Sequence, residues 1–387
     1  MGNESLLRRE VQQWIRNATA SLSALAFKGS PFADIPLPLL LQQVEGWRKV
    51  KDKLPVWHET PNLLFPPKLS IEQCSSAITA KYKAGLISGS SMADITGGFG
   101  VDAYYFAQKF DLVHYFERNA DLCAIAQHNF KQLSAPIVCA PKDGLNAIKV
   151  QRYDAIYVDP ARRHDAKGKV FFLEDCSPDL TEHLPALLQS APVILVKTSP
   201  MLDLSKGLDQ FGTVASVHVV AVQNEVKELL WVITAAYQQN PMIYTINYNK
   251  KETETFDFQW GNSVKTSYHD PLVYLYEPNA ALLKAGAFDA LTAQYAVQKI
   301  AHHAHLYTCS DLIDFPGRRF VIEQQFPYTK ATMAQFKKTK CHVTTRHFPE
   351  TVSQLRDKWR LSDGGDCYLF FTTLDSGQKV VLRTHKI

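Results

Sequence analysis

MADITGGFGVDA, residues 92–103, is the stretch that decides the fold, because it has the pattern of a strand, a tight turn and a helix start. Residues 92–95 form a short apolar run, residues 96–100 have turn composition, and the apolar spacing over residues 101–109 is helical. Three closely spaced glycines let the backbone turn sharply and let a ligand approach it without a Cβ in the way. The stretch therefore predicts a ligand pocket.

Carboxylates surround this turn. Asp94 ends the predicted strand, Asp102 lies in the first turn of the helix, and Glu117 follows the next predicted strand, residues 112–116. An acid at the position of Glu117 can accept hydrogen bonds from both hydroxyl groups of a ribose. We interpret the surroundings of the turn as a nucleotide pocket without phosphates, although Gly98, Gly100 and Ala103 also satisfy the relaxed G-x-G-x-x-A pattern of dinucleotide-binding folds. The alternative is an ordinary strand-helix turn with incidental acids.

Length and composition are those of an ordinary globular protein with two or three domains. No apolar run approaches the roughly 20 residues needed to cross a bilayer, and the N-terminus has no leader pattern, so we expect a cytoplasmic protein without a membrane. Seven cysteines form no C-x-x-C pair, as is typical of reduced thiols. The histidines at 302, 303 and 305 have no partner at ligand spacing, so no metal is expected.

The region before the turn is predicted to be helical. Residues 1–68 combine helical apolar spacing with many prolines, and residues 69–83 are predicted to form one helix. On that helix Gln73, Ser76 and Thr79 share a face. A polar face beside the glycine-rich turn either lines the cofactor pocket or faces solvent, and both interpretations stay open.

Strand and helix patterns alternate over residues 91–234, which predicts an α/β sheet of the Rossmann-like type with helices on both faces. The last two of seven predicted strands, 214–222 and 228–234, are joined by a short link. Parallel neighbours need a crossover of about a dozen residues or more, so this pair is predicted to be an antiparallel hairpin at the sheet edge. A dehydrogenase-type sheet would be parallel throughout.

These features resemble the class I S-adenosylmethionine-dependent methyltransferases over about residues 70–234. The resemblance implies S-adenosyl-L-methionine as cofactor, Glu117 as the ribose acid, and Asp143 as the partner of the adenine amino group. It also implies an active-site motif that begins with Asp159. The residues expected to bind the cofactor are Asp94, Thr96, Gly97, Gly98, Phe99, Gly100, Asp102, Glu117, Arg118, Asp143, Gly144, Asp159 and Pro160, with Gln73, Ser76 and Thr79 from the upstream helix.

The motif at Asp159 departs from the family pattern Asp/Asn-Pro-Pro-Tyr/Phe, because Ala161 and Arg162 replace the second proline and the aromatic residue. The resemblance therefore supports methyl transfer more firmly than methylation of a base nitrogen. Asp159 is the expected proton acceptor or substrate anchor. Arg162 and Arg163 are expected at the active site, where they can grip a phosphate or carboxylate or stack on a base; the alternative for Arg163 is a surface charge.

Lys197, near the end of the strand at residues 193–198, is expected either to contact the substrate or to be structural. Methylation of a pyrimidine at C5 needs a cysteine nucleophile, and neither strand-end motif contains one. Direct transfer to a base nitrogen or a ribose oxygen is therefore expected.

Residues after 234 predict an α+β accessory part with a long helix over residues 280–300 and a final hairpin. Between residues 317 and 360 there are ten Lys/Arg against three Asp/Glu. This surplus favours a polyanion such as RNA, and Arg318, Arg319, Lys337 and Lys338 are the expected substrate contacts. The alternative is that these lysine-rich faces only contact solvent and bind no polyanion.

The whole chain resembles a bacterial group of methyltransferases with a ferredoxin-like segment and a THUMP-like C-terminal domain, on the motifs at residues 277–281 and 314–318. It implies four parts: a helical N-terminal region (1–68), a methyltransferase domain (69–236), a linker with a ferredoxin-like segment (237–318) and a THUMP-like domain (319–387). We expect methylation of tRNA or rRNA. A methyltransferase for a small anionic substrate and a catalytically silent RNA-binding protein are the alternatives, and the oligomeric state is not predicted.

Overall fold

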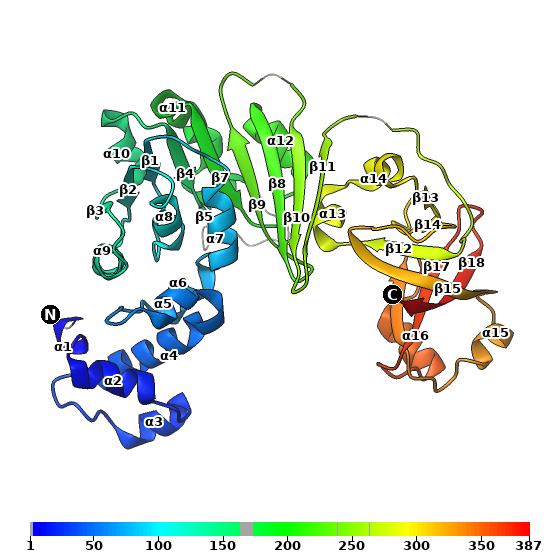
Figure 1. Cartoon of the computed structure of the whole chain (residues 1–387), viewed down its shortest axis with the longest axis horizontal. Coiled ribbons are helices and arrows are strands. Elements are labelled where there is room, and N and C mark those ends of the chain that lie inside the picture. The colour runs from blue at the N-terminus through cyan, green and yellow to red at the C-terminus, as the bar shows by residue number, and fades with distance from the viewer. Residues whose placement is uncertain (1–2, 163–172, 238, 263) are drawn as a thin grey trace. The chain divides into compact units, whose positions relative to one another are not determined.

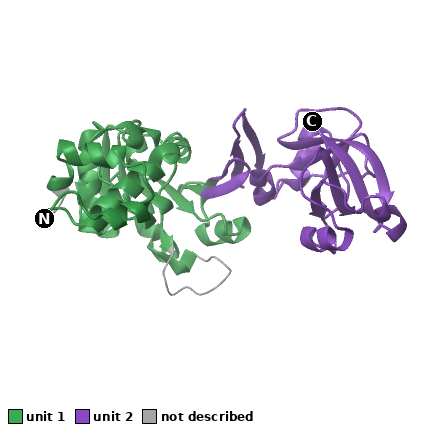
Figure 2. Cartoon of the chain, turned by 90° about the horizontal axis from the view of Figure 1, so that it is seen from below, with its two compact units in different colours: residues 1–215, 230–239 green, residues 216–229, 240–387 purple. Residues whose placement is uncertain are grey.

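The computed structural model describes residues 3–162, 173–237, 239–262 and 264–387. The chain divides into two compact units, one formed by residues 1–215 and 230–239 and the other by residues 216–229 and 240–387 (Figure 2). Figure 1 traces the elements along the chain.

The N-terminal region is helical, as predicted. Val11, Ile15, Leu40 and Val44 are fully or almost fully buried in one hydrophobic cluster, so the apolar stripes of the helices pack on each other. The helices are α1 (Asn3–Leu6), α2 (Arg9–Asn17), α3 (Leu22–Lys28), α4 (Leu37–Lys53) and α5 (Pro55–Glu59).

The predicted single helix over residues 69–83 is wrong. The chain forms α6 (Lys68–Gln73) and α7 (Ala77–Ala84), separated by residues with extended backbone. The Ser76 hydroxyl accepts a hydrogen bond from the Thr79 amide at 3.3 Å and so starts α7 as its N-cap. A serine that satisfies a free helix amide competes with continuation of the preceding helix, which explains the break.

The first unit contains the core of a doubly wound sheet. Strand β1 (Ser91–Asp94) lies between β2 (Leu112–Phe116) and β4 (Ala155–Val158), and both pairings are parallel. Parallel strands bring their carboxyl ends to one edge, which places Asp94, Glu117 and Asp159 near each other. The remaining elements of this part are α8 (Val101–Phe106), α9 (Ala120–Gln132), β3 (Ile137–Ala140), α10 (Gly144–Ala147), η1 (Ile148–Val150), β5 (Ala161–Arg162), η2 (Leu173–Asp175), β6 (Cys176–Ser177), α11 (Leu180–Ser190), β7 (Val193–Thr198) and α12 (Leu204–Phe211).

The predicted hairpin exists, but it is not at the sheet edge. Strands β8 (Val214–Val222) and β9 (Glu225–Ile233) are neighbours joined by Gln223 and Asn224, both with positive φ, as a two-residue hairpin turn requires. Beyond β8 the sheet continues with β10 (Met242–Tyr248) and β11 (Thr253–Gln259). The sheet thus has nine strands in the order β11-β10-β8-β9-β7-β4-β1-β2-β3, two more than the seven predicted.

A second sheet of seven strands organises the C-terminal part, in the order β13-β14-β12-β15-β18-β17-β16. Phe370 and Leu382 belong to one buried cluster, whereas their strand neighbours Phe371 and Val381 belong to another, so both faces of this sheet are covered. The strands are β12 (Tyr274–Pro278), β13 (Gln298–Lys299), β14 (Tyr307–Cys309), β15 (Gly317–Pro327), β16 (His342–Arg346), β17 (Cys367–Thr373) and β18 (Lys379–Lys386).

The helices of this part differ from the prediction at one point. The long helix predicted over residues 280–300 is divided into α13 (Ala280–Ala285) and α14 (Phe288–Tyr295), because Gly286 adopts a left-handed conformation that ends α13. Two further helices of this part are α15 (Lys330–Ala334) and α16 (Val352–Trp359).

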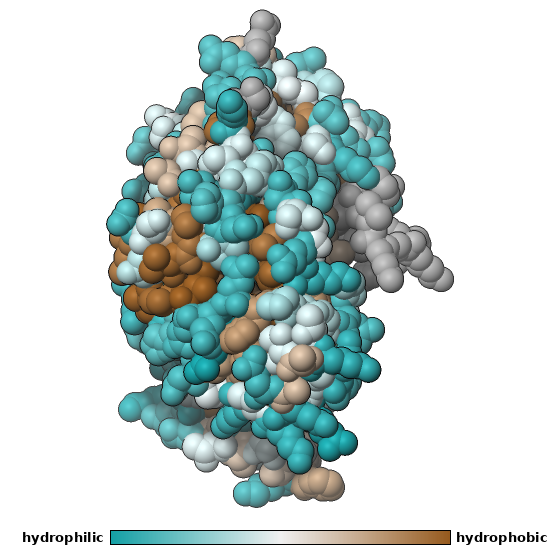
Figure 3. Space-filling view, turned by 90° about the vertical axis from the view of Figure 1, so that its right-hand side faces the viewer, coloured by the Kyte–Doolittle hydropathy of each residue, from teal (hydrophilic) through white to brown (hydrophobic). Residues whose placement is uncertain are grey.

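The face drawn in Figure 3 is mainly hydrophilic, and its largest hydrophobic area lies on the left of the view. Among the described residues, no helix combines the length and the apolar composition that crossing a bilayer would require.

Candidate functional site

A cavity of about 710 Å³ lies in the first unit, at the carboxyl ends of β1, β2 and β4. Its walls come from the glycine-rich turn, the break between α6 and α7, the start of α10, and the segment after β6. This is the edge at which ligands bind in open α/β sheets.

The glycine-rich turn can form only because of its glycines. Gly98 and Gly100 have φ values of +57° and +83°, and a Cβ on Gly97 would lie 2.2 Å from the ring of Tyr115. The Tyr115 hydroxyl also donates a hydrogen bond to the Gly98 carbonyl at 2.5 Å. The backbone of the turn is therefore packed from behind and open toward the cavity.

Glu117 follows β2 and its carboxylate is held in a fixed orientation. One oxygen accepts a hydrogen bond from the Gly98 amide and the other from the Asn119 amide, each at 2.8 Å. A carboxylate oxygen has two lone pairs, so each keeps one for a ligand. The predicted ribose acid thus lies in the cavity wall beside the glycine-rich turn.

Asp143 and Gly144 line the cavity at the start of α10. The Asp143 carboxylate caps this helix, with the Leu145 amide donating at 2.9 Å. Arg118 bridges this corner, since its guanidinium lies 3.9 Å from Asp143 and donates to the Ser177 hydroxyl at 3.3 Å. Its side chain is 64% exposed, so it reaches solvent at the cavity wall.

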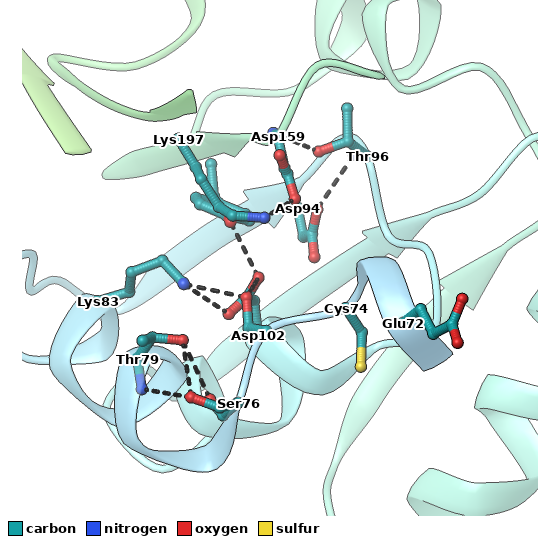
Figure 4. A network of polar contacts seen from close by, with 12 residues as sticks. Glu72, Cys74, Ser76, Thr79, Lys83, Asp94, Thr96, Asp102, Asp159 and Lys197 are labelled. Atoms are coloured by element: carbon teal, nitrogen blue, oxygen red, sulfur yellow. Dashed lines mark hydrogen bonds and ion pairs between the residues drawn. The ribbon is translucent and has the colours of Figure 1, made fainter. Parts of the chain in front are cut away.

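Asp159, which follows β4, forms an ion pair with Lys197 of β7, with 2.5 Å between Oδ2 and Nζ (Figure 4). The Asp159 amide donates to the Thr96 hydroxyl at 2.7 Å, which ties the end of β4 to the glycine-rich turn. Lys197 lines the cavity, and its contact with Asp159 means that it orients this carboxylate.

Asp102 connects three segments around the cavity through contacts with Ser75, Tyr157 and Lys83. Its Oδ2 accepts hydrogen bonds from the Ser75 hydroxyl at 2.8 Å and from the Tyr157 hydroxyl at 2.9 Å. The fully buried Lys83 lies 3.4 Å from Oδ1 and donates to the Ser75 hydroxyl at 3.0 Å (Figure 4). Sequence spacing placed Lys83 on the same predicted polar face as Gln73, Ser76 and Thr79, but it gave no signal for Ser75 or Tyr157, whose contacts with Asp102 depend on the packing of distant segments.

Asp94 is the most deeply buried of these carboxylates, with 1% exposure. It accepts a hydrogen bond from the Thr96 amide at 3.0 Å. Burial, reinforced by the charges of Asp102, Asp159 and Glu117, raises the pKa of the Asp94 carboxyl group well above its usual range.

Not every predicted site residue faces the cavity. Gln73 and Phe99 line it, whereas Ser76 and Thr79 are absent from its lining and form the α7 cap. Pro160 is buried next to Asp159 in the chain and is also absent from the lining. The Arg162 side chain and the whole of Arg163 lie outside the described residues.

Cys74, which the sequence did not single out, does line the cavity. Burial raises the pKa of its thiol to about 11, so the thiol stays protonated near neutral pH. In the described part of the chain, no group of three or more His, Cys, Asp and Glu is arranged to hold a metal ion.

The basic residues of the second unit fall into two sets. Arg318 pairs with Glu277 and Arg319 with Asp314, so both expected substrate contacts already have internal partners. By contrast, Lys337 and Lys338 are exposed. The exposed basic side chains without an ion pair among the described residues of this segment are Lys330, Lys337, Lys338, Lys340 and Arg360.

Comparisons with known proteins agree with this architecture. A ferredoxin-like domain model matches residues 274–316 and a THUMP domain-like model matches residues 317–386. No protein with a curated function matches the sequence.

Among solved structures, the chain is similar to a "putative methyltransferase" from Porphyromonas gingivalis W83, with 33% identity and a TM-score of 0.87 over 100% of this chain and 99% of that one. An rRNA methylase from Streptococcus thermophilus is 11% identical with a TM-score of 0.29, over 41% of this chain and 93% of that one. A tRNA (uracil-54, C5)-methyltransferase from Pyrococcus abyssi is 16% identical with a TM-score of 0.30, over 45% and 41%. The last two likenesses are too weak to bear on this chain.

The full-length match at 33% identity, the class I sheet and the two C-terminal domain matches agree with one another. The chain belongs to the family of the Porphyromonas gingivalis protein, a group of class I methyltransferases with ferredoxin-like and THUMP-like C-terminal domains.

Proposed function

We propose that the protein is an S-adenosylmethionine-dependent methyltransferase that binds its cofactor in the 710 Å³ cavity. The observation that carries this proposal is the Glu117 carboxylate, which lines the cavity and is oriented by two backbone amides, while each of its oxygens keeps a lone pair for a ligand. These groups fit the cofactor. The ribose hydroxyls need hydrogen-bond acceptors, which the carboxylate provides, and the glycine-rich turn leaves room beside its backbone.

Three parts of the lining would hold different parts of the cofactor. Glu117 would hold the ribose, Asp143 the adenine amino group, and the backbone of residues 96–100 the methionine end. When bound, the cofactor supplies an electrophilic methyl group on a sulfonium. The protein then has to position the nucleophile in line and remove one proton if that nucleophile is neutral.

We assign Asp159 as the group that accepts this proton from the nucleophile. Its carboxylate lies at the end of β4, in the cavity wall, and Lys197 fixes its orientation through the 2.5 Å ion pair. A substrate amino or hydroxyl group that donates a hydrogen bond to Asp159 would lose its proton to the carboxylate during transfer. The high pKa of Cys74 supports direct transfer over a route through a cysteine nucleophile.

RNA is the substrate class that we propose, specifically tRNA or rRNA. The THUMP domain-like match covers residues 317–386. Exposed cations that form no ion pair with any described residue, including Lys337 and Lys338, lie in the same segment. Such cations bind the phosphate backbone and release counterions, so the binding would weaken as salt increases.

The test is methyl transfer from radiolabelled S-adenosylmethionine to total bacterial RNA and, separately, to an RNA-free small-molecule extract. We expect label in RNA, and we expect Asp159→Ala to reduce the rate by about 10²–10⁴-fold, the usual contribution of general base catalysis. Asp209→Ala is the matched control, because Asp209 is exposed on α12 and is absent from the cavity lining.

Label only in the extract would replace RNA with a small anionic substrate. Full activity of Asp159→Ala would show that another group takes the proton. No label in either pool would contradict the proposed activity.

A further inference from the structure

The carboxylates around the methionine end of the cavity are not equally neutralised. Asp102 has Lys83 at 3.4 Å and Asp159 has Lys197 at 2.5 Å. Glu117 has no such cation in the described part of the chain, but its carboxylate accepts hydrogen bonds from two backbone amides. Asp94 accepts one backbone amide, and within the residues that the structure describes it forms no ion pair.

Burying a carboxylate without a cation is costly, and the group avoids the cost by staying protonated or by gaining a cationic ligand. Asp94 is 1% exposed, so water solvates its charge poorly. It lines the cavity, so a ligand can reach it. Its surroundings therefore provide one backbone amide but no cation for an ionised carboxylate among the described residues.

The charged groups around Asp94 further disfavour its ionised form. Asp102 on α8, Asp159 after β4 and Glu117 after β2 all act on it as negative charges. The two nearby lysines are engaged elsewhere, since Lys83 contacts Asp102 and Lys197 contacts Asp159.

We propose that Asp94 is the counter-ion of the cationic cofactor and that its carboxyl group gives up one proton to solvent when the cofactor binds. This inference rests on the proposed function, because it assumes that the cavity holds S-adenosylmethionine. The O–H bond of the carboxyl group breaks, the proton passes to the buffer, and the carboxylate remains as the partner of the ligand's positive charge.

The same arrangement distinguishes the cofactor from its product. S-adenosylmethionine carries a net charge of +1 near neutral pH, whereas S-adenosylhomocysteine has lost the sulfonium charge and is neutral overall. An ionised Asp94 among three other carboxylates gains more from the cation. Transfer of the methyl group then lowers the affinity for the bound product and favours re-protonation of Asp94, which promotes product release.

The test is isothermal titration calorimetry of the full chain with S-adenosylmethionine, at one pH in two buffers of different ionisation enthalpy, repeated between pH 5.5 and 8.5. The difference in observed heat gives the number of protons released. We expect a release approaching one proton at low pH and an affinity that rises with pH, by at most about tenfold per pH unit as one proton competes with the ligand. S-adenosylhomocysteine should release fewer protons.

Asp94→Asn is the variant that isolates the group, because the amide is isosteric and has no proton to give up. It should bind the cofactor more weakly, with proton release abolished and affinity nearly independent of pH. Asp209→Asn, an exposed site away from the cavity, should behave as the wild type. The wild-type proton count tests the inference even if the Asp94 variant does not fold.

The outcomes separate the two proposals. Binding without proton release in the wild type, or undiminished release in Asp94→Asn, would overturn this inference and leave the cofactor site intact. Absence of saturable binding at every pH would overturn the proposed cofactor site and this inference with it.

Discussion

Two buried carboxylates, one in each unit, have opposite surroundings. Asp94 in the cavity of the first unit is 1% exposed and has no ion-pair partner among the described residues. Glu277 on β12 of the second unit is 2% exposed and contacts both Arg318 and Arg346, the latter at 2.8 Å. The charge of Glu277 is neutralised within the fold, whereas the charge of Asp94 is left to a ligand.

The comparison shows that the partners of a buried carboxylate distinguish a structural role from a role in binding. A carboxylate with two guanidinium partners joins strands, because Glu277, Arg318 and Arg346 lie on β12, β15 and β16. A carboxylate in a cavity wall without a cation costs stability in the empty protein. Such a cost is typical of a functional site, where it is recovered on binding.

Lys83→Met should have the largest effect on the free energy of unfolding. The substitution would leave Asp102, like Asp94, as a buried carboxylate without a cation beside it. Removing one partner of a buried ion pair costs about 3–5 kcal/mol, and Lys83 is fully buried. Chemical denaturation should show this loss, whereas Lys81→Met, at an exposed position of the same helix, should change the free energy of unfolding little. A loss below about 1 kcal/mol for Lys83→Met would contradict the role of the pair.

Glu277→Gln should have the next largest effect, confined to stability. We expect a loss of about 2 kcal/mol, less than for a fully buried pair, because Arg318 and Arg346 are about one-third exposed and regain water. Calorimetric unfolding measures this loss, and cofactor affinity should not change. Glu323→Gln is the control, since its pair with Arg383 at 2.9 Å is exposed and such pairs contribute about 0–1 kcal/mol.

Asp94→Asn should have the smallest effect on stability and the opposite sign. The pKa of Asp94 is raised in the folded protein, so between its usual value near 3.8 and the raised value the folded state holds more protons than the unfolded state. Stability therefore falls as pH rises through that window. The amide variant should lose this slope and be more stable than the wild type at neutral pH, as unfolding at several pH values would show; an unchanged slope would refute the assignment.

Much of the cavity could be predicted from local sequence. The glycine-rich turn, Glu117, Asp143 and Asp159 are each tied to the end of a strand, and parallel pairing brings strand ends together. The sheet class and the β8–β9 hairpin followed from strand spacing in the same way.

Contacts between distant segments could not be predicted. Ser75 lines the cavity only because the Ser76 cap ends α6 and starts α7, and Lys83 meets Asp102 only once α7 packs on α8. Likewise, the basic surplus after residue 317 did not reveal that Arg318 and Arg346 are both paired with Glu277. In each case the partner lies on another element, so neither composition nor periodicity carries the signal.

The most direct test of the cavity as the cofactor site is the affinity for S-adenosylmethionine of the wild type, Glu117→Ala and Glu277→Gln, measured side by side. The wild type and Glu277→Gln should bind equally well, and Glu117→Ala should lose ~1.5–3 kcal/mol for each hydrogen bond to the carboxylate. Wild-type affinity in Glu117→Ala would contradict the account, because the cofactor would then lie elsewhere.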